Sequence, residues 1–170
     1  FSEDGYRVMS NRSWQAVRAP LGRDTGKWYY EIQAQVGGNG FNFSGIGRTA
    51  SVLDGCCTGN NDSWGYYGGA GNLRGMGTNH SPNATQWRDG SFTIGVAVDL
   101  DNDRIWWALD GVWQAGGNPG TGTAPTFSDV SGTVYPQTSV ALANSFSTLN
   151  ACPDRIRFDP PAGFGVWGVE

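Results

Sequence analysis

Residues 89–114 constrain the fold more than any other stretch, because apolar residues there alternate with polar or small ones. A period of two is typical of a β-strand with one buried face. The first such strand carries on its apolar face Phe92, Ile94, Val96, Val98 and Leu100. Residues 101–103, Asp-Asn-Asp, favour a turn, and the chain returns as Arg104–Leu109. We therefore predict a long β-hairpin around which the rest of the chain packs.

A second stretch, Lys27–Val36, alternates in the same way. Its predicted core face carries Trp28, Tyr30, Ile32, Ala34 and Val36, and its predicted solvent face carries Tyr29, Glu31, Gln33 and Gln35. Shorter strands or extended segments are predicted at residues 6–10, 13–18, 41–48, 64–67, 72–74, 133–142 and 155–158. The main predicted loops are residues 49–62, 68–88, 115–131 and 143–153. No stretch keeps a helical period for more than a turn, so the predicted fold class is all-β.

The composition fits an all-β domain with many turns. Gly occurs 27 times, aromatic residues make up 13% of the chain, and charged residues make up 15%. A helical domain would carry more Lys, Glu, Leu and Ala. A length of 170 residues predicts a single domain over residues 1–170 with a substantial core. Because the chain begins at Phe1, we expect a piece excised or processed from a longer protein.

The charge pattern excludes one class of partner. The formal net charge is −4, Lys27 is the only Lys, and the Arg residues are scattered singly. Nucleic-acid binding needs a basic patch, so we expect no nucleic-acid partner. No apolar run approaches the length of a membrane span, so we expect no membrane insertion. The sequence leaves the oligomeric state open.

The cysteines are too few for a disulfide framework. Cys56 and Cys57 are adjacent, and Cys152 lies far along the chain. Adjacent cysteines can pair with each other only under strain. Two arrangements stay open, namely reduced thiols and a bridge from Cys56 or Cys57 to Cys152.

The sequence does not contain the residue types that a catalytic site or a calcium-binding loop would need at the required positions. Asp99, Asp101 and Asp103 are spaced like a calcium loop, but Arg104 and Asp110 stand where an EF-hand needs Gly and Glu. His80, the only histidine, lies in a predicted polar loop, and Glu is rare. We therefore predict no catalytic residue, no metal, no cofactor and no enzymatic activity.

A series of short motifs resembles the SPRY domain, the module shared with B30.2 proteins. In chain order these motifs lie at residues 26–31, 45–47, 63–66, 94–99, 105–111, 134–136 and 155–158. The resemblance runs from about Tyr6 to Phe164. Residues 117–125, GNPGTGTAP, are most similar to SPRY variants on phage and bacterial proteins.

The resemblance implies a bent, two-layer antiparallel β-sandwich of the concanavalin-like jelly-roll type. It also implies a non-catalytic binding module that holds a protein or peptide partner on loops at one end of the sandwich. The phage and bacterial likeness implies an accessory module on a virion or cell surface; otherwise we expect a cytoplasmic protein. A carbohydrate-binding, lectin-like module is the alternative, because exposed aromatic rings stack on sugars.

SPRY proteins that bind Asn-rich peptides carry a tyrosine where this chain has Arg74, so that peptide specificity is not carried over. The predicted site rests instead on aromatic and Arg residues outside the core, because these types dominate interface hot spots. We predict that the partner contacts a subset of Tyr67, Arg74, Trp87, Trp106 and Trp113. For Trp106, alternation with Ile105 and Leu109 predicts an outer position. The alternative is that Trp106 is buried under a covering loop.

Overall fold

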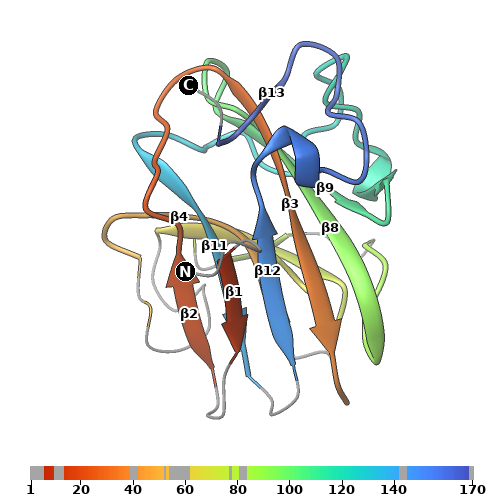
Figure 1. Cartoon of the computed structure of the whole chain (residues 1–170). Helices are drawn as coiled ribbons and strands as arrows, with labels where there is room; N and C mark the ends of the chain where they lie inside the picture. The colour runs from red at the N-terminus through yellow and green to blue at the C-terminus, as the bar shows by residue number, and fades with distance from the viewer. Residues whose placement is uncertain are drawn as a thin grey trace.

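The computed structural model is a sandwich of two β-sheets (Figure 1). It describes residues 6–9, 14–38, 42–51, 53, 62–76, 78–80, 84–141 and 145–168. Strand pairing is antiparallel throughout both sheets, apart from one short parallel pair near the C-terminus. The predicted all-β, two-layer architecture is confirmed. Within these residues, no helix is long and apolar enough to cross a membrane.

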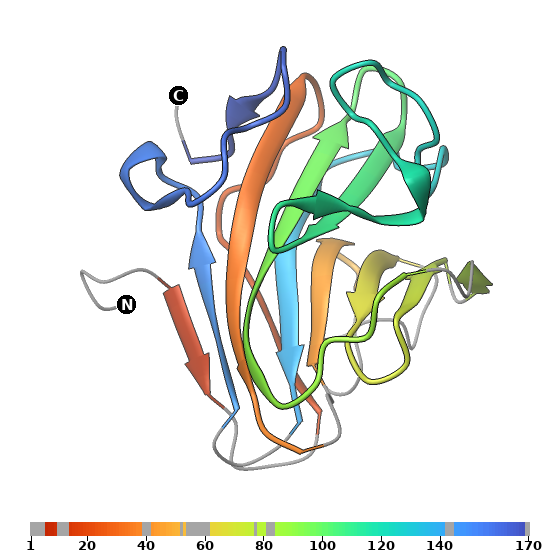
Figure 2. The ribbon, with the colours of Figure 1, turned by 90° about the vertical axis from the view of Figure 1, so that its right-hand side faces the viewer.

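The first sheet contains both strands that alternate most clearly in the sequence. Its order is β1 (Tyr6–Met9), β12 (Phe146–Asn150), β3 (Lys27–Val36), β8 (Gly90–Asp99), β9 (Arg104–Leu109) and β10 (Val112–Trp113). The short strand β13 (Gly165–Val166) pairs with β3 in parallel. Both views place the N-terminal strand β1 beside β12 (Figure 1, Figure 2).

The second sheet faces the first across the core. Its order is β2 (Gln15–Arg18), β11 (Val134–Val140), β4 (Asn42–Arg48), β5 (Ser63–Tyr67), β6 (Asn72–Gly75) and β7 (Thr78–His80). Each sheet therefore ends in a short strand on the same side of the sandwich, β1 in the first and β2 in the second. On this side the described residues leave a pocket between the sheets, and we call it the open side of the sandwich.

The predicted hairpin is formed by β8 and β9. Their register joins Ile94 to Leu109 and Asp99 to Arg104, and Asp103 in the turn has a positive φ of 58°. The Asp99 carboxylate accepts hydrogen bonds from the Asn102 amide and pairs with Lys27 Nζ at 3.0 Å. The Asp99 carboxylate therefore links the hairpin turn to the start of β3.

Aromatic side chains of the first sheet bind backbone oxygens of the second. Trp107 is fully buried, and its Nε1 donates to the Ser44 carbonyl at 3.0 Å. Tyr30, also fully buried, donates its hydroxyl to the Gly45 carbonyl at 2.5 Å. These bonds satisfy polar groups inside the core and hold the two sheets in register, which is how buried Trp and Tyr are usually accommodated.

Three sequence predictions about strands are wrong. Residues 143–153, predicted as a loop, contain β12, and residues 78–88 contain β7. β12 has a weak apolar pattern, but β1 and β3 pair with it on both sides. Residues 155–158, predicted as a strand, begin in the 3-10 turn Pro153–Arg155 and form none of the strands in the described part of the chain.

The predicted solvent face of β3 is only partly exposed. Tyr29 and Glu31 are 1% and 0% exposed, whereas Gln33 is exposed. The C-terminal segment, residues 151–168, lies over the upper part of β3 (Figure 1). Alternation correctly separates the two faces of β3, but it carries no information about a segment that packs on the outer face later in the chain.

Cys152 is an exposed, free thiol. The reduced alternative therefore holds for this residue. Cys56 and Cys57 lie outside the described residues.

Candidate binding surface

Trp106 is buried, so the prediction of an outer, accessible position is wrong. Its side chain is 1% exposed, and Nε1 donates to the Thr123 carbonyl at 2.9 Å. Phe164 packs edge-on against its ring, with ring centroids 6.3 Å apart. Trp106 does lie on the outer face of the first sheet, but the predicted loop at residues 115–131 and the C-terminal segment cover it. The covering-loop alternative is correct.

Trp87 is also buried, and its predicted place outside the core is wrong. Its side chain is 0% exposed and packs edge-on against Tyr66 and Phe92. The Trp87 backbone N–H donates to the Gly68 carbonyl at 3.1 Å, which draws this segment against the end of β5. The neighbouring residues are polar, so no local pattern marks Trp87 as a core residue.

Trp113 is partly buried and packs against the cluster of Tyr29, Ala97, Trp106 and Phe164. It sits on β10 at the edge of the first sheet, edge-on to Tyr29 with ring centroids 6.3 Å apart. Tyr67 and Arg74 belong to the second sheet. The structure therefore divides the predicted set, with Tyr67 and Arg74 together on the second sheet and Trp106 and Trp113 together on the first.

Tyr67 and Arg74 form the centre of a cluster on the outer face of the second sheet. The guanidinium carbon of Arg74 lies 5.2 Å from the centroid of the Tyr67 ring. Phe43 stacks against Tyr67 with an interplanar angle of 23°, and Trp14 is tilted against Tyr67 at a centroid distance of 6.0 Å. We call Trp14, Phe43, Tyr67 and Arg74 the Tyr67 surface.

Glycine makes this arrangement possible. A Cβ atom on Gly65 would overlap the Phe43 ring, so the missing side chain lets Phe43 lie flat on the sheet with 0% exposure. Gly65 also pairs with Arg74 in the β5–β6 register. The Arg74 side chain therefore meets no side chain directly across on β5 and reaches the Tyr67 ring.

The Tyr67 surface presents a cation and partly buried aromatic rings together. Tyr67, Arg74 and Trp14 are all half-buried, and Phe43 forms the floor beneath them. An arginine stacked on an aromatic ring keeps its planar set of donors available for carbonyl or carboxylate oxygens. The surface can therefore combine apolar contact with hydrogen bonding to an anion or a peptide group.

Two members of the Tyr67 surface were missed from the sequence. Phe43 could have been found, because it lies an odd number of positions from the inward-facing Ile46 and so occupies the opposite face of β4. Trp14 could not, because it precedes β2 with a positive φ of 50°. Alternation does not extend to such a backbone conformation.

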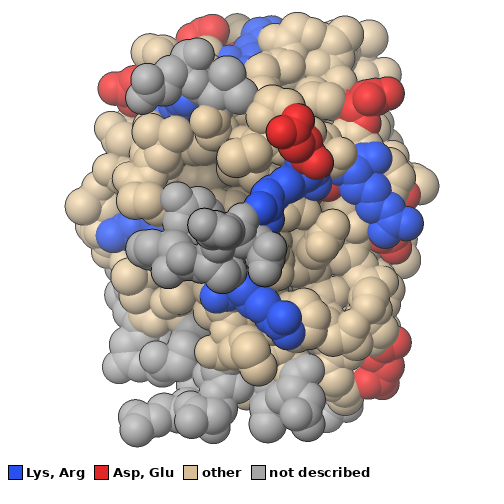
Figure 3. Space-filling model, viewed as in Figure 1, with Lys and Arg blue, Asp and Glu red and all other residues tan. Residues whose placement is uncertain are grey.

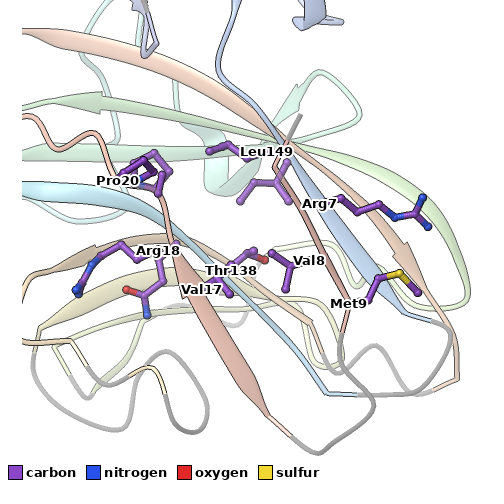
Figure 4. Close-up of a pocket in the computed structure, with 12 residues that line it drawn as sticks. Arg7, Val8, Met9, Val17, Arg18, Pro20, Thr138 and Leu149 are labelled. Atoms are coloured by element: carbon purple, nitrogen blue, oxygen red, sulfur yellow. The ribbon is translucent and has the colours of Figure 1, made fainter. Parts of the chain in front are cut away.

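The open side of the sandwich contains an apolar pocket of about 310 Å³. It lies between β1 and β2 and reaches inward to Ile32 and Leu149 (Figure 4). Arg7 and Arg18 stand at its margin, and no acidic residue lines it among those that the structure describes. This pocket was not predicted, because it depends on where the two sheets end.

A smaller pocket of about 220 Å³ lies on the outer face of the first sheet, with Gln33, Gln35, Ser91 and Arg157 among its lining residues. Figure 3 shows this side of the molecule, where the coloured basic and acidic atoms form separate small groups. The described residues contain no group of three or more His, Cys, Asp or Glu that could hold a metal ion.

Comparison with known proteins identifies the fold. No protein-family model matches the chain, and no curated protein matches it. Among solved structures, the SPRY domain of human HERC1 superposes with a TM-score of 0.65, covering 81% of this chain and 82% of that chain. The chain has the SPRY fold. The resemblance drawn from the motif order is confirmed at the level of fold, and the sequence identity is 18%. Strands β5 and β6 carry the central pair of the Tyr67 surface.

Proposed function

We propose that this chain is a non-catalytic interaction module that binds a protein or peptide partner through the Tyr67 surface. The observation that carries the proposal is the stacked pair of Tyr67 and Arg74, 5.2 Å apart on the outer face of the second sheet. Tyr and Arg are among the residue types that dominate interface hot spots, because each provides a large contact area together with polar groups. The SPRY fold supports the same class of function.

The surface suits a peptide segment that carries both an apolar side chain and an acceptor. Trp14 and Tyr67 provide partly exposed aromatic area, and Arg74 provides the cation beside it. The floor, Phe43, is already buried and stacked against Tyr67 before a partner binds. Preorganised contacts of this kind reduce the entropic cost of association.

The carbohydrate-binding alternative has less support. It relied on aromatic rings lying open for stacking on sugar faces, and Trp87 and Trp106 are buried. The Tyr67 ring already contacts Phe43, Trp14 and Arg74. A role as an accessory module of a phage or bacterial surface protein stays a prediction, as do the cellular location and the oligomeric state.

The test of this function compares two libraries on one immobilised protein. A random-peptide display library is selected on the chain, and a glycan array is probed with the same preparation. We expect enriched peptides that bind the folded chain and lose binding in the Tyr67→Ala variant. Specific binding to glycans together with no enriched peptide would contradict the proposal and favour the lectin-like alternative.

A further inference from the structure

The side of the sandwich between β1 and β2 combines an apolar pocket with the end strands of both sheets. β1 and β2 are the end strands of their sheets, and the apolar pocket of about 310 Å³ lies between them. An end strand presents backbone N–H and C=O groups that its own sheet does not pair. On β2, the Ala16 N–H donates a hydrogen bond to the Leu53 carbonyl at 3.0 Å. Within the described residues, the backbone of β1 pairs with β12 and with no other strand.

The two faces of β1 differ sharply in chemistry. Val8 pairs with Ser147, and the Ser147 hydroxyl accepts a hydrogen bond from Thr138 of the opposite sheet at 3.2 Å, so this position faces the interior. Arg7 and Met9 therefore lie on the outer face. The Arg7 guanidinium carbon is 3.7 Å from the Phe146 ring centroid, and Met9 is 65% exposed.

Among the described residues that line the pocket, the charged ones are basic. Arg7 and Arg18 line it, and the described part of the chain adds no Asp or Glu to the lining, although the chain as a whole carries a net charge of −4. Arg18 is occupied, because its Nη1 donates to the carbonyls of Arg48 and Thr49 at 2.6 and 3.0 Å. Although Arg7 belongs to the lining, its side chain points away from the pocket, on the outer side of β1 (Figure 4). Among the described residues, it is the cation beside the edge of β1 that does not face β12.

We propose that an extended segment of a protein partner pairs with the free edge of β1 and closes the pocket. In a strand added to a sheet edge, side chains alternate between the two faces. One set points into the apolar pocket, beside Val8 and Ala19, and the other set lies on the outer face, beside Arg7. The segment recognised is therefore one in which apolar and acidic residues alternate.

The size of the pocket supports side chains as the occupants. A volume of about 310 Å³ stands at the lower end of the range for small-molecule sites. β1 is four residues long, so a paired strand of similar length directs about two side chains inward. A second copy of this chain is the competing occupant, and it would appear as a dimer whose population rises with protein concentration.

The experiment uses synthetic peptides that differ only in pattern, with binding measured by titration calorimetry. The probe alternates Val and Glu, with Ser-Gly flanks and blocked ends. The controls are a peptide of identical composition with Val and Glu in separate blocks, a Val-Lys alternating peptide, and the probe with N-methylated backbone nitrogens. We expect the probe to bind, and each control to bind at least about tenfold more weakly.

Two variants locate the site. Ala19→Phe fills the pocket and should weaken probe binding at least about tenfold. Val112→Phe introduces the same side chain at an exposed position on β10 and should leave probe binding unchanged. Arg7→Glu should reverse the preference, so that the Val-Lys peptide binds better than the probe. Arg7 is exposed, so this test stands even where Ala19→Phe impairs folding.

Equal binding of the alternating and block peptides would overturn this proposal, as would an unchanged preference in Arg7→Glu. Concentration-dependent dimerisation that blocks the peptide would assign the edge to a second copy and would also overturn it. Tyr67→Ala should not affect probe binding. Failure of this proposal therefore leaves the function of the Tyr67 surface untouched, and the reverse also holds.

Discussion

The carboxylate of Glu31 holds the C-terminal segment through the backbone of Arg157, whose N–H donates to Oε2 at 2.8 Å. Oε1 accepts the Phe158 N–H at 2.8 Å and the Tyr29 hydroxyl at 2.9 Å. Glu31 is 0% exposed, so these three donors replace water around a buried charge. Together with the β13–β3 pairing, this side chain holds the C-terminal segment over part of the outer face of the first sheet, which alternation assigns to solvent.

Removing this carboxylate should destabilise the chain strongly. Glu31→Ala leaves three donors without their charged acceptor, and we expect it to lower the free energy of unfolding by about 3 kcal/mol. Gln33→Ala, two positions along the same strand on an exposed part of the face, should change it by about 0.5 kcal/mol or less. Urea unfolding followed by tryptophan fluorescence compares the two variants. Equal stability of Glu31→Ala and the parent chain would show that the segment is held by other contacts.

Trp107 should be the most costly hairpin residue to truncate. It is fully buried, and its Nε1 binds the Ser44 carbonyl of the opposite sheet. Trp107→Ala should cost about 3–5 kcal/mol, the usual loss for a large buried aromatic residue. Trp113→Ala is the matched control, because Trp113 is only partly buried, and it should cost clearly less. A loss below about 1 kcal/mol at Trp107, measured by thermal or urea unfolding, would contradict the described core.

Two buried tyrosines should make stability fall at alkaline pH. Burial, the nearby charge of Glu31 and the hydrogen bond to it raise the pKa of Tyr29 above its ordinary range. Burial raises the pKa of Tyr66 in the same direction. Because the folded pKa values exceed the unfolded value of about 10, this stabilisation is complete below that pH and is lost as the pH rises toward the folded pKa values.

Urea unfolding between about pH 8 and pH 11 measures this effect, with tyrosinate absorbance recorded in parallel. We expect the free energy of unfolding to decline over the upper part of the range. The decline should be smaller in a Tyr29→Phe, Tyr66→Phe double variant. Normal ionisation of all tyrosines in the folded chain would contradict the burial of Tyr29 and Tyr66.

The inner faces of the sheets could be predicted because they depend on local periodicity. Tyr30, Ile32, Ile94, Val96 and Trp107 alternate within single strands, and all five are buried. The outer faces could not be predicted in this way. Trp106 is covered by Thr123 and Phe164, and only the folded chain brings those residues to it.

Part of the binding surface could also be predicted from the sequence. Tyr66 and Tyr67 alternate on β5, so one of them had to face outward, and Tyr67 does. Arg74 was chosen by residue type, and the β5–β6 pairing brings it to Tyr67. Trp14 and the apolar pocket depend on a positive φ and on the ends of two sheets, neither of which leaves a periodic signal.

The most direct test of the central claim measures the affinity of a library-selected peptide for four proteins. These are the parent chain, Tyr67→Ala, Arg74→Ala and the control Val112→Ala, which changes an exposed residue on the other sheet. Near-UV circular dichroism confirms that each variant is folded. We predict that Tyr67→Ala and Arg74→Ala each weaken binding by about 2 kcal/mol, close to thirtyfold in Kd, and that Val112→Ala has no effect. Unchanged affinity in both Tyr67→Ala and Arg74→Ala would contradict the assignment of partner binding to the Tyr67 surface.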